Sequence, residues 1–204
     1  MKMGWILGWA VPVPWFKIQV EAVFPEDTHV FVEPGPDVWE QLESAASFDT
    51  LGGYSLGAQL LLENPTRAAQ LSAKIGLFAP IFSFAQEAAL GGKITSTQMK
   101  YLAKWLRRDR AAALMDFYQR AGLDITAGMS SGISPATLEW GLGRLETGET
   151  PPPAPRGWKL FCGTDDALLD GGHLARLDPA VRLVVGATHH PQMLLRAWAK
   201  ELTG

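Results

Sequence analysis

The chain has 204 residues, of which 47% are hydrophobic, and a formal net charge of −3, so it suits one globular domain of ordinary size. The acidic balance argues against a nucleic-acid-binding protein, and the single cysteine, Cys162, excludes an internal disulfide and is expected as a buried strand residue. No apolar run approaches the ~20 residues of a membrane span, and Pro12 and Pro14 interrupt the apolar start, so we expect no secretory signal, no membrane association and a cytoplasmic location.

Six short apolar segments alternate with helical or irregular stretches, which is the pattern of a parallel α/β sheet. The expected strands span residues 4–8, 29–33, 49–54, 74–78, 158–162 and 181–185. The stretch before the third strand leaves no room for the antiparallel opening strands of larger α/β enzymes, since one βαβ unit takes about 30 residues. We therefore predict an α/β fold with a mainly parallel sheet of about six strands.

The first expected strand ends in Gly8-Trp9, and this dipeptide has two interpretations. In an ordinary tight turn, Trp9 is a core side chain. Beside a nucleophile, the backbone N–H of Trp9 is suited to stabilise an oxyanion, because such donors come from the loop after an early strand. The oxyanion interpretation therefore requires a nucleophile elsewhere in the chain.

The third expected strand leads into Gly53-Tyr54-Ser55-Leu56-Gly57, a G-x-S-x-G motif. A nucleophile elbow needs this pattern, because the chain leaves a strand, turns with the serine in a strained conformation and enters a helix. Residues 58–63 are strong helix formers that end at Asn64-Pro65. Strand, turn and helix therefore occur in the required order, although a glycine-flanked serine also occurs in ordinary turns.

The segment after the fourth expected strand is helical in character. Apolar residues three and four positions apart occur over 98–106 and 114–118, and Ser134-Pro135 is typical of a helix start. Proline-rich residues 151–155 then return the chain to the core. We predict a core of residues 1–80 and 151–204, with residues 81–150 inserted as a helical lid; a helical subdomain packed away from the serine is the alternative.

The last two expected strands each lead into a pair of polar residues. Asp165 and Asp166 come after one strand, and His189 and His190 come after the other. The carboxyl ends of parallel strands lie at one edge of a sheet, where α/β proteins place their sites. Turn or helix-capping carboxylates and a surface histidine pair are the alternatives. The spacing matches no metal-binding motif, so we predict no metal and no cofactor.

Serine, acid and histidine in this order would supply an acyl-transfer site. A histidine takes the hydroxyl proton, and a carboxylate holds the histidine in the right tautomer. The backbone N–H groups of Trp9 and Leu56 are the expected oxyanion donors. The expected substrate-pocket residues are Tyr54, Phe78 and Phe82, and apolar walls of this kind suit an acyl chain better than a sugar or phosphate.

Gly8-Trp9, the G-x-S-x-G motif, Gly163-x-x-Asp166 and Gly186-x-x-His189-x-Pro191 together resemble the α/β-hydrolase superfamily over nearly the whole chain. Within it, the chain is most similar to the pimeloyl-ACP methyl ester esterases of biotin synthesis. Those enzymes have Gly-Trp at the oxyanion loop, an aromatic residue before the nucleophile and a Leu-x-x-Gly-Leu-x-x-Leu pattern, which residues 138–145 match.

The resemblance implies a reduced α/β-hydrolase fold that cleaves a carboxylic ester through an acyl-enzyme. It also implies three roles, namely Ser55 as nucleophile, Asp166 as acid and His189 as base. A shift of one residue in register would exchange Asp166 for Asp165 or His189 for His190.

The resemblance further implies an acyl carrier protein as a partner, because lid arginines contact the carrier in that family. Arg107, Arg108 and Arg110 lie in the corresponding segment, whereas Ala112 and Asp116 stand where the family has arginine. The expected partner is therefore a small ester or acyl substrate, with or without a carrier. A carboxylesterase or thioesterase outside biotin synthesis, and a non-catalytic ligand-binding protein, are the alternative functions.

Overall fold

The computed structural model describes residues 1–45, 47–126, 128–130 and 132–202. Six strands form the central sheet in the order β2-β1-β3-β4-β7-β8, and every neighbouring pair is parallel. Their bounds are Lys2–Ile6 (β1), Thr28–Val32 (β2), Thr50–Tyr54 (β3), Ile75–Phe78 (β4), Lys159–Gly163 (β7) and Val181–Val184 (β8). The predicted parallel sheet of six strands is confirmed, and all six strands end at the same edge.

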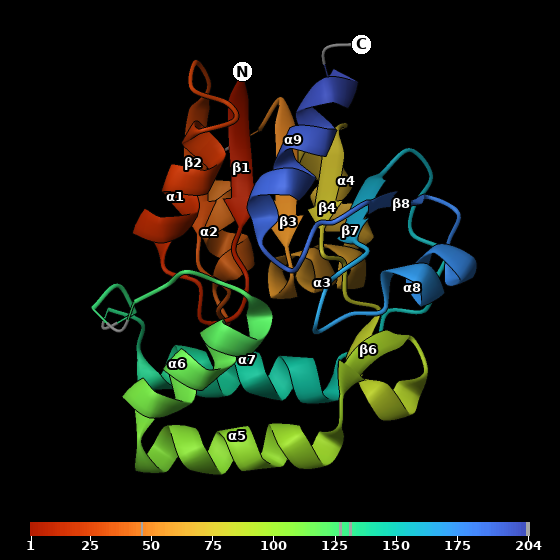
Figure 1. Ribbon diagram of the computed structural model, residues 1–204. Coiled ribbons are helices and arrows are strands. Elements are labelled where there is room, and N and C mark those ends of the chain that lie inside the picture. The colour runs from red at the N-terminus through yellow and green to blue at the C-terminus, as the bar shows by residue number, and fades with distance from the viewer. Residues whose placement is uncertain (46, 127, 131, 203–204) are drawn as a thin grey trace.

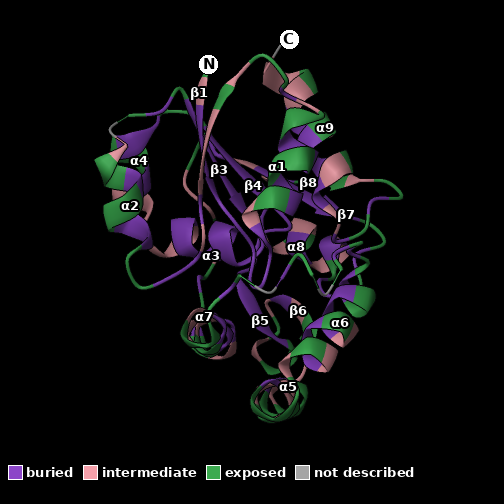
Figure 2. Ribbon diagram, turned by 90° about the vertical axis from the view of Figure 1, so that its left-hand side faces the viewer, coloured by how far each residue is buried: buried purple, intermediate pink, exposed green. Residues whose placement is uncertain are grey.

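Helices cover both faces of this sheet (Figures 1 and 2). On one face lie α1 (Val13–Glu21) and α9 (Pro191–Leu202), and on the other lie α2 (Val38–Ser44), α3 (Leu56–Glu63) and α4 (Pro65–Leu71). A further helix, α8 (Gly171–Leu177), packs against β8. Figure 2 shows the central strands almost wholly buried between these layers. No helix within the described residues has the length and apolar character to cross a membrane.

Residues 81–150, here called the insertion, leave the sheet after β4 and return before β7. The insertion contains β5 (Ser83–Ala85), the 3-10 helix η1 (Gln86–Ala88), β6 (Gly91–Ile94), α5 (Ser96–Arg108), α6 (Arg110–Ala121) and α7 (Pro135–Thr147). Figure 1 shows α5, α6 and α7 beyond the carboxyl edge of the sheet. The two ends of the insertion pair with each other. Ser83 forms a β-bridge with Glu149, and the Thr150 N–H donates to the Phe82 carbonyl at 2.7 Å.

Several local features differ from expectation for identifiable reasons. The sequence did not predict β5 or β6. The three residues of β5 are too few to show an alternating pattern, and β6 begins with two glycines, which are rare in strands. Pro65, expected to end a helix, is also the first residue of the next helix, α4. At that position the missing N–H of proline costs no helical hydrogen bond. The first strand ends at Ile6 rather than at residue 8, which leaves Gly8 in a loop. Cys162 is buried in β7 as expected.

The close approach of α3 to β1 gives a test of this packing. A Cβ atom on Gly57 would lie 2.1 Å from the Ile6 carbonyl oxygen, a backbone atom that cannot rotate away. Gly57→Ala is therefore expected to lower the free energy of unfolding by about 2–3 kcal/mol, measured by urea denaturation.

Gly143→Ala is the matched control, because Gly143 lies in α7 and a Cβ there would meet nothing within 4 Å. That variant is expected to gain up to about 1 kcal/mol from better helix propensity. A Gly57→Ala protein as stable as the wild type would contradict the close helix–strand contact.

Candidate active site

Ser55 forms the sharp turn between β3 and α3. Its backbone has φ +54° and ψ −114°, a conformation that residues with side chains adopt rarely and at a cost of about 1–3 kcal/mol. The flanking glycines make the turn possible, since a Cβ on Gly53 would lie 2.8 Å from the Gly57 carbonyl oxygen. The Ser55 N–H donates to the Phe78 carbonyl of β4 at 2.8 Å, which anchors the turn to the next strand.

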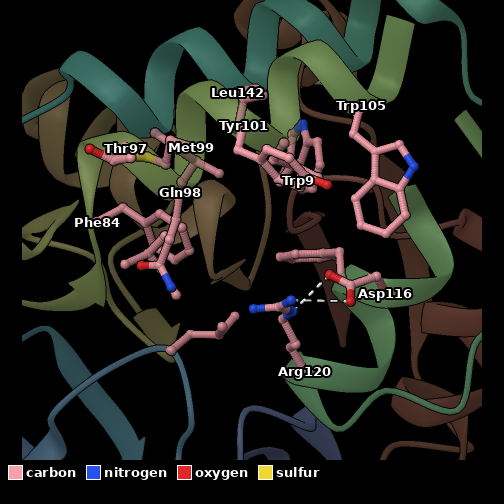
Figure 3. Close-up of a pocket in the computed structure, with 15 residues that line it drawn as sticks. Trp9, Phe84, Thr97, Gln98, Met99, Tyr101, Trp105, Asp116, Arg120 and Leu142 are labelled. Atoms are coloured by element: carbon pink, nitrogen blue, oxygen red, sulfur yellow. Dashed lines mark hydrogen bonds and ion pairs between the residues drawn. The ribbon is translucent and has the colours of Figure 1, made fainter. Parts of the chain in front are cut away.

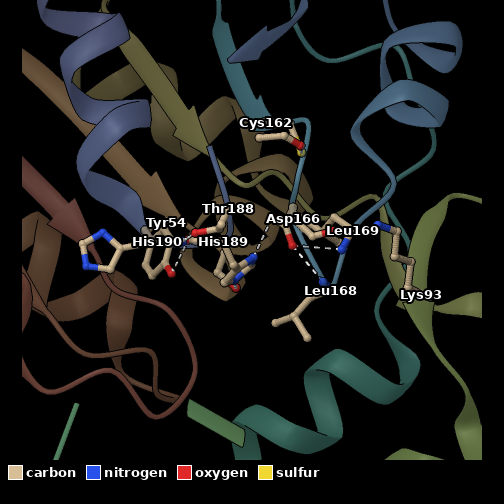
Figure 4. Close-up of polar contacts among 11 residues, drawn as sticks. Tyr54, Lys93, Cys162, Asp166, Leu168, Leu169, Thr188, His189 and His190 are labelled. Carbon is tan, nitrogen blue, oxygen red and sulfur yellow. Dashed lines mark hydrogen bonds and ion pairs between the residues drawn. The ribbon is translucent and has the colours of Figure 1, made fainter. Parts of the chain in front are cut away.

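His189 lies in the loop between β8 and α9 and contacts both of its expected partners (Figure 4). Its Nε2 is 3.1 Å from Ser55 Oγ, and its Nδ1 is 2.8 Å from Asp166 Oδ2. The Tyr54 hydroxyl donates to the His189 backbone carbonyl at 2.8 Å and so fixes the loop. Ser55, Asp166 and His189 are all buried, and Ser55 is the most accessible of the three at 7%. The structure thus joins the three residues in one hydrogen-bonded series.

The surroundings of Asp166 favour its ionised form. Its Oδ1 accepts hydrogen bonds from the backbone N–H groups of Leu168 at 2.8 Å and Leu169 at 3.1 Å. Burial acts to raise the pKa of this carboxyl, but the charge of His189 and the hydrogen bonds outweigh it, so the pKa of Asp166 is lowered. An ionised Asp166 holds a proton on His189 Nδ1, and this leaves Nε2 free to accept the Ser55 hydroxyl proton.

Asp165 and His190, the sequence neighbours of Asp166 and His189, have other partners. Asp165 is exposed and accepts a hydrogen bond from the Thr164 hydroxyl at 2.9 Å. His190 lies 3.4 Å from Asp124, and its ring meets Trp15 edge-on with centroids 5.2 Å apart. The alternative register, with Asp165 in the place of Asp166 or His190 in the place of His189, is therefore not the one that the fold adopts.

The loop after β1 lies beside the serine turn. In the sheet register Ile6 is opposite Gly53, and a Cβ on Gly8 would lie 3.2 Å from Ser55 Cβ. The Val11 N–H donates to the Gly8 carbonyl at 3.3 Å and closes a turn around residues 8–11, here called the oxyanion loop.

The two expected oxyanion donors, Trp9 and Leu56, therefore flank Ser55 from the oxyanion loop and from the first position of α3. Neither backbone N–H donates to an acceptor among the described residues.

A cavity of about 340 Å³ lies between the insertion and the carboxyl edge of the sheet (Figure 3). Its walls are largely apolar, and they include Phe84, Met99, Trp105, Phe117 and Leu142. Trp9 and Leu168 also line it, so the cavity adjoins the oxyanion loop on one side and the Asp166 loop on the other.

Two charged residues, Asp116 and Arg120, are the only charged groups among the described cavity-lining residues. Their side chains pair with each other, with Arg120 Nε 2.7 Å from Asp116 Oδ2. Thr97, Gln98 and Tyr101 are the other polar side chains in a lining that is mainly apolar.

The three aromatic residues expected in the pocket lie outside this cavity. Tyr54 is fully buried and stacks on Phe16 with ring centroids 5.4 Å apart. Phe78 packs against Trp198 with centroids 5.3 Å apart, and Phe82 is 1% exposed. Tyr54 and Phe78 end β3 and β4 beneath the helices that cover the sheet, while Phe82 lies at the base of the insertion, where its carbonyl accepts from the Thr150 N–H. Most of the cavity walls come instead from α5, α6 and α7, whose helical character the sequence predicted without indicating which side chains would face a cavity.

The three arginines expected to bind a carrier lie near the junction of α5 and α6, away from the cavity. Exposed Arg107 pairs with Glu139 at 3.2 Å, and Arg110 donates to the Ile133 carbonyl at 3.2 Å. Arg108 is exposed at the end of α5. Arg107 and Arg110 line a separate hollow of about 400 Å³.

Two further residues contact the site without having been identified from the sequence. The Lys93 ammonium donates to the Asp166 backbone carbonyl at 2.6 Å (Figure 4). The Tyr118 hydroxyl donates to the Ala10 carbonyl of the oxyanion loop at 2.6 Å. Lys93 comes after two glycines and carries no recognisable signal. Tyr118 did carry a signal in the sequence, because a tyrosine on the apolar face of an amphipathic helix needs a partner for its hydroxyl.

No protein-family model matches the chain, and no curated protein matches it by sequence. Its fold, however, is similar to that of many solved structures. A hydrolase from Oleispira antarctica has a TM-score of 0.72 at 12% identity, over 98% of this chain and 91% of that one. A thermophilic esterase from Thermogutta terrifontis has a TM-score of 0.67 at 15% identity, over 100% of this chain and 89% of that one.

The epimerase BotH, solved in complex with bottromycin A2, is also similar, with a TM-score of 0.68 at 15% identity over 100% of this chain and 89% of that one. Together with the sheet order, these similarities establish that the chain has the α/β-hydrolase fold. At such low identities the similarity extends to the fold alone.

The site geometry gives a prediction about the reactivity of Ser55. Asp166→Asn is expected to slow phosphonylation of Ser55 by a fluorophosphonate probe roughly 10³-fold or more, because the amide no longer fixes the His189 tautomer. The labelling rate is measured by mass spectrometry of the Ser55 peptide.

Asp165→Asn is the control and is expected to react within about twofold of the wild type. Ser55→Ala gives the unlabelled background. Equal slowing by the two asparagine variants would show that Asp166 has no special part in activating Ser55.

Proposed function

We propose that the protein is a cytoplasmic serine hydrolase that cleaves carboxylic esters through an acyl-enzyme. The series of contacts from Asp166 through His189 to Ser55 carries this proposal, with 2.8 Å and 3.1 Å between the bonded atoms. The strained turn at Ser55 and the two N–H groups beside it add support, since both features serve acyl transfer. The similar structures described as an esterase and a hydrolase are consistent with this activity.

In the first half-reaction, His189 Nε2 accepts the Ser55 hydroxyl proton as Oγ attacks the ester carbonyl. The carbonyl π electrons move to oxygen, and the N–H groups of Trp9 and Leu56 stabilise the resulting oxyanion. The intermediate collapses, the bond to the alkoxide breaks, and His189 returns its proton to the departing alcohol. Asp166 stabilises the imidazolium throughout.

The second half-reaction repeats the sequence with water. His189 takes a proton from water, the hydroxide attacks the acyl carbon, and the carboxylic acid leaves as Ser55 recovers its proton. Loss of one oxyanion donor in such a site typically lowers the rate by about 10²–10³-fold.

The cavity supports an apolar acyl group as the substrate class. Its walls offer few polar partners apart from the Asp116–Arg120 pair, which suits a chain that is mainly hydrocarbon. Because the cavity would hold the acyl part, the same site accommodates oxygen esters and thioesters. We place oxygen esters first on the resemblance to the esterases of biotin synthesis.

As the finer proposal, the substrate is the methyl ester of pimeloyl-ACP. Residues 138–145, which carry the Leu-x-x-Gly-Leu-x-x-Leu pattern, lie in α7, and the Leu138 carbonyl accepts a hydrogen bond from the Trp9 indole at 2.9 Å. The carrier would meet the arginines near the junction of α5 and α6. Arg107 and Arg110 already have partners within the chain, so Arg108 is the arginine we assign to the carrier.

Similarity to BotH, an epimerase, favours a second candidate of another class. A protein of this fold that binds a ligand without hydrolysing it would keep the cavity and leave Ser55 unreactive. Labelling of Ser55 by the fluorophosphonate separates the two candidates.

The finer proposal is tested by methanol release from pimeloyl-ACP methyl ester and from the free monomethyl ester of pimelic acid. The wild type is expected to hydrolyse both, and Ser55→Ala neither. Arg108→Glu is expected to lower kcat/KM for the carrier-bound ester about tenfold while leaving the free ester unchanged, because only the carrier presents an acidic surface.

Arg156→Glu is the charge-matched control, because Arg156 is exposed and lies outside the insertion. Hydrolysis of the free ester without hydrolysis of the carrier-bound one would reject the biotin assignment and leave the esterase proposal standing.

The acyl cavity gives a separate prediction for p-nitrophenyl esters. From acetyl to hexanoyl, kcat/KM is expected to rise at least tenfold, since each buried methylene contributes about 0.8 kcal/mol. Thr97→Trp is expected to remove this rise without affecting the acetyl ester, because exposed Thr97 lines the cavity.

Lys104→Trp adds the same side chain to the same helix at an exposed position outside the cavity, and it is expected to behave as the wild type. An unchanged chain-length profile in Thr97→Trp would show that the acyl group binds elsewhere.

A further inference from the structure

The oxyanion loop has few interactions of its own to hold it. It forms one turn, closed by the 3.3 Å hydrogen bond from the Val11 N–H to the Gly8 carbonyl. Within the turn Ala10 has φ +59°, a left-handed conformation that glycine adopts easily and alanine does not. The loop therefore needs support from outside to keep this shape.

That support comes from α6. Tyr118 is fully buried, and its hydroxyl donates to the Ala10 carbonyl at 2.6 Å. Burial raises the pKa of Tyr118 to about 12, so the hydroxyl remains protonated and acts as the donor. The bond joins the insertion to the residue directly after Trp9, across 108 positions of sequence.

The Trp9 side chain is held by the insertion as well. Its indole Nε1 donates to the Leu138 carbonyl of α7 at 2.9 Å, and its ring meets Phe117 edge-on with centroids 4.7 Å apart. A Cβ on Gly141 would lie 2.6 Å from Trp9 Cδ1, so α7 approaches the indole as closely as a glycine allows. Backbone and side chain of Trp9 are thus both fixed by α6 and α7, which Figure 1 places beyond the end of β1.

We propose that Tyr118 is a positioning residue for the oxyanion hole, acting through the Ala10 carbonyl to set the orientation of the Trp9 N–H. This inference rests on the proposed function, because it assigns the insertion a part in transition-state stabilisation as well as in substrate binding. A shift of the donor matters because oxyanion stabilisation depends on donors placed in advance at short distance.

Tyr118→Phe tests the proposal, since it removes only the hydroxyl. With a p-nitrophenyl ester, kcat is expected to fall about tenfold while KM stays within twofold, because the oxyanion exists only in the transition state.

Thr150→Val is the matched control. Thr150 is also buried, and its hydroxyl contacts the carbonyls of Ile81 at 3.2 Å and Phe82 at 3.3 Å, at the base of the insertion and away from the oxyanion loop. Thr150→Val removes a buried hydrogen bond, as Tyr118→Phe does, so the two variants are expected to lose similar stability. For Thr150→Val, kcat is expected to stay within twofold of the wild type.

A second readout does not depend on turnover. In the ¹⁵N-resolved spectrum of the free protein, the amide signals of Trp9 and Ala10 are expected to move in Tyr118→Phe and to remain in place in Thr150→Val. If the wild type hydrolyses no ester, the proposed function fails, and the amide signals still decide whether Tyr118 sets the loop.

The inference is overturned if Tyr118→Phe and Thr150→Val have the same kcat, or if the Trp9 amide signal is unmoved by loss of the Tyr118 hydroxyl. A fall in kcat accompanied by an equal fall for Thr150→Val would assign Tyr118 to general stability alone.

Discussion

The buried hydrogen bond between Asp166 and His189 is the interaction on which the rest of the site depends. A carboxylate that is 1% exposed is stable as an anion only when its oxygens are well bonded, because desolvation of a charge is costly. Here His189 bonds one oxygen and two backbone N–H groups of the next turn bond the other. The resulting charge fixes the imidazole tautomer, and the tautomer makes the Ser55 hydroxyl a potential nucleophile. The parallel sheet brings the three residues together, since the loops that carry them follow β3, β7 and β8 at one edge.

The insertion contributes to the site in more than one way. Its helices line a mainly apolar cavity, and its side chains contact the two loops that flank Ser55. Lys93 bonds the backbone of Asp166, while Tyr118 bonds the backbone of Ala10. The insertion therefore contacts the carboxyl edge of the sheet on both sides of Ser55, at the Asp166 loop and at the loop after β1.

The sequence predicted the sheet and the residues that meet in the site, because strands and G-x-S-x-G turns are specified by local patterns. It left the choice between Asp165 and Asp166 to resemblance, since adjacent residues differ only in the direction that the loop gives them. It assigned Tyr54, Phe78 and Phe82 to the pocket, whereas the structure buries all three outside the cavity, because an aromatic residue near a strand end fits core and pocket equally well. The partners of Lys93 and Tyr118 lie far away in sequence, so no local pattern could identify them.

The central claim is that Ser55 forms the covalent acyl intermediate, and a slowly released acyl group tests it most directly. The protein is incubated with a p-nitrophenyl carbamate, and modified peptides are identified by mass spectrometry while residual ester hydrolysis is monitored. The account predicts one carbamoyl group per chain, located on Ser55, and loss of activity in proportion to its formation. Ester hydrolysis that persists with Ser55 carbamoylated, or that is lost through modification of another residue, would contradict it.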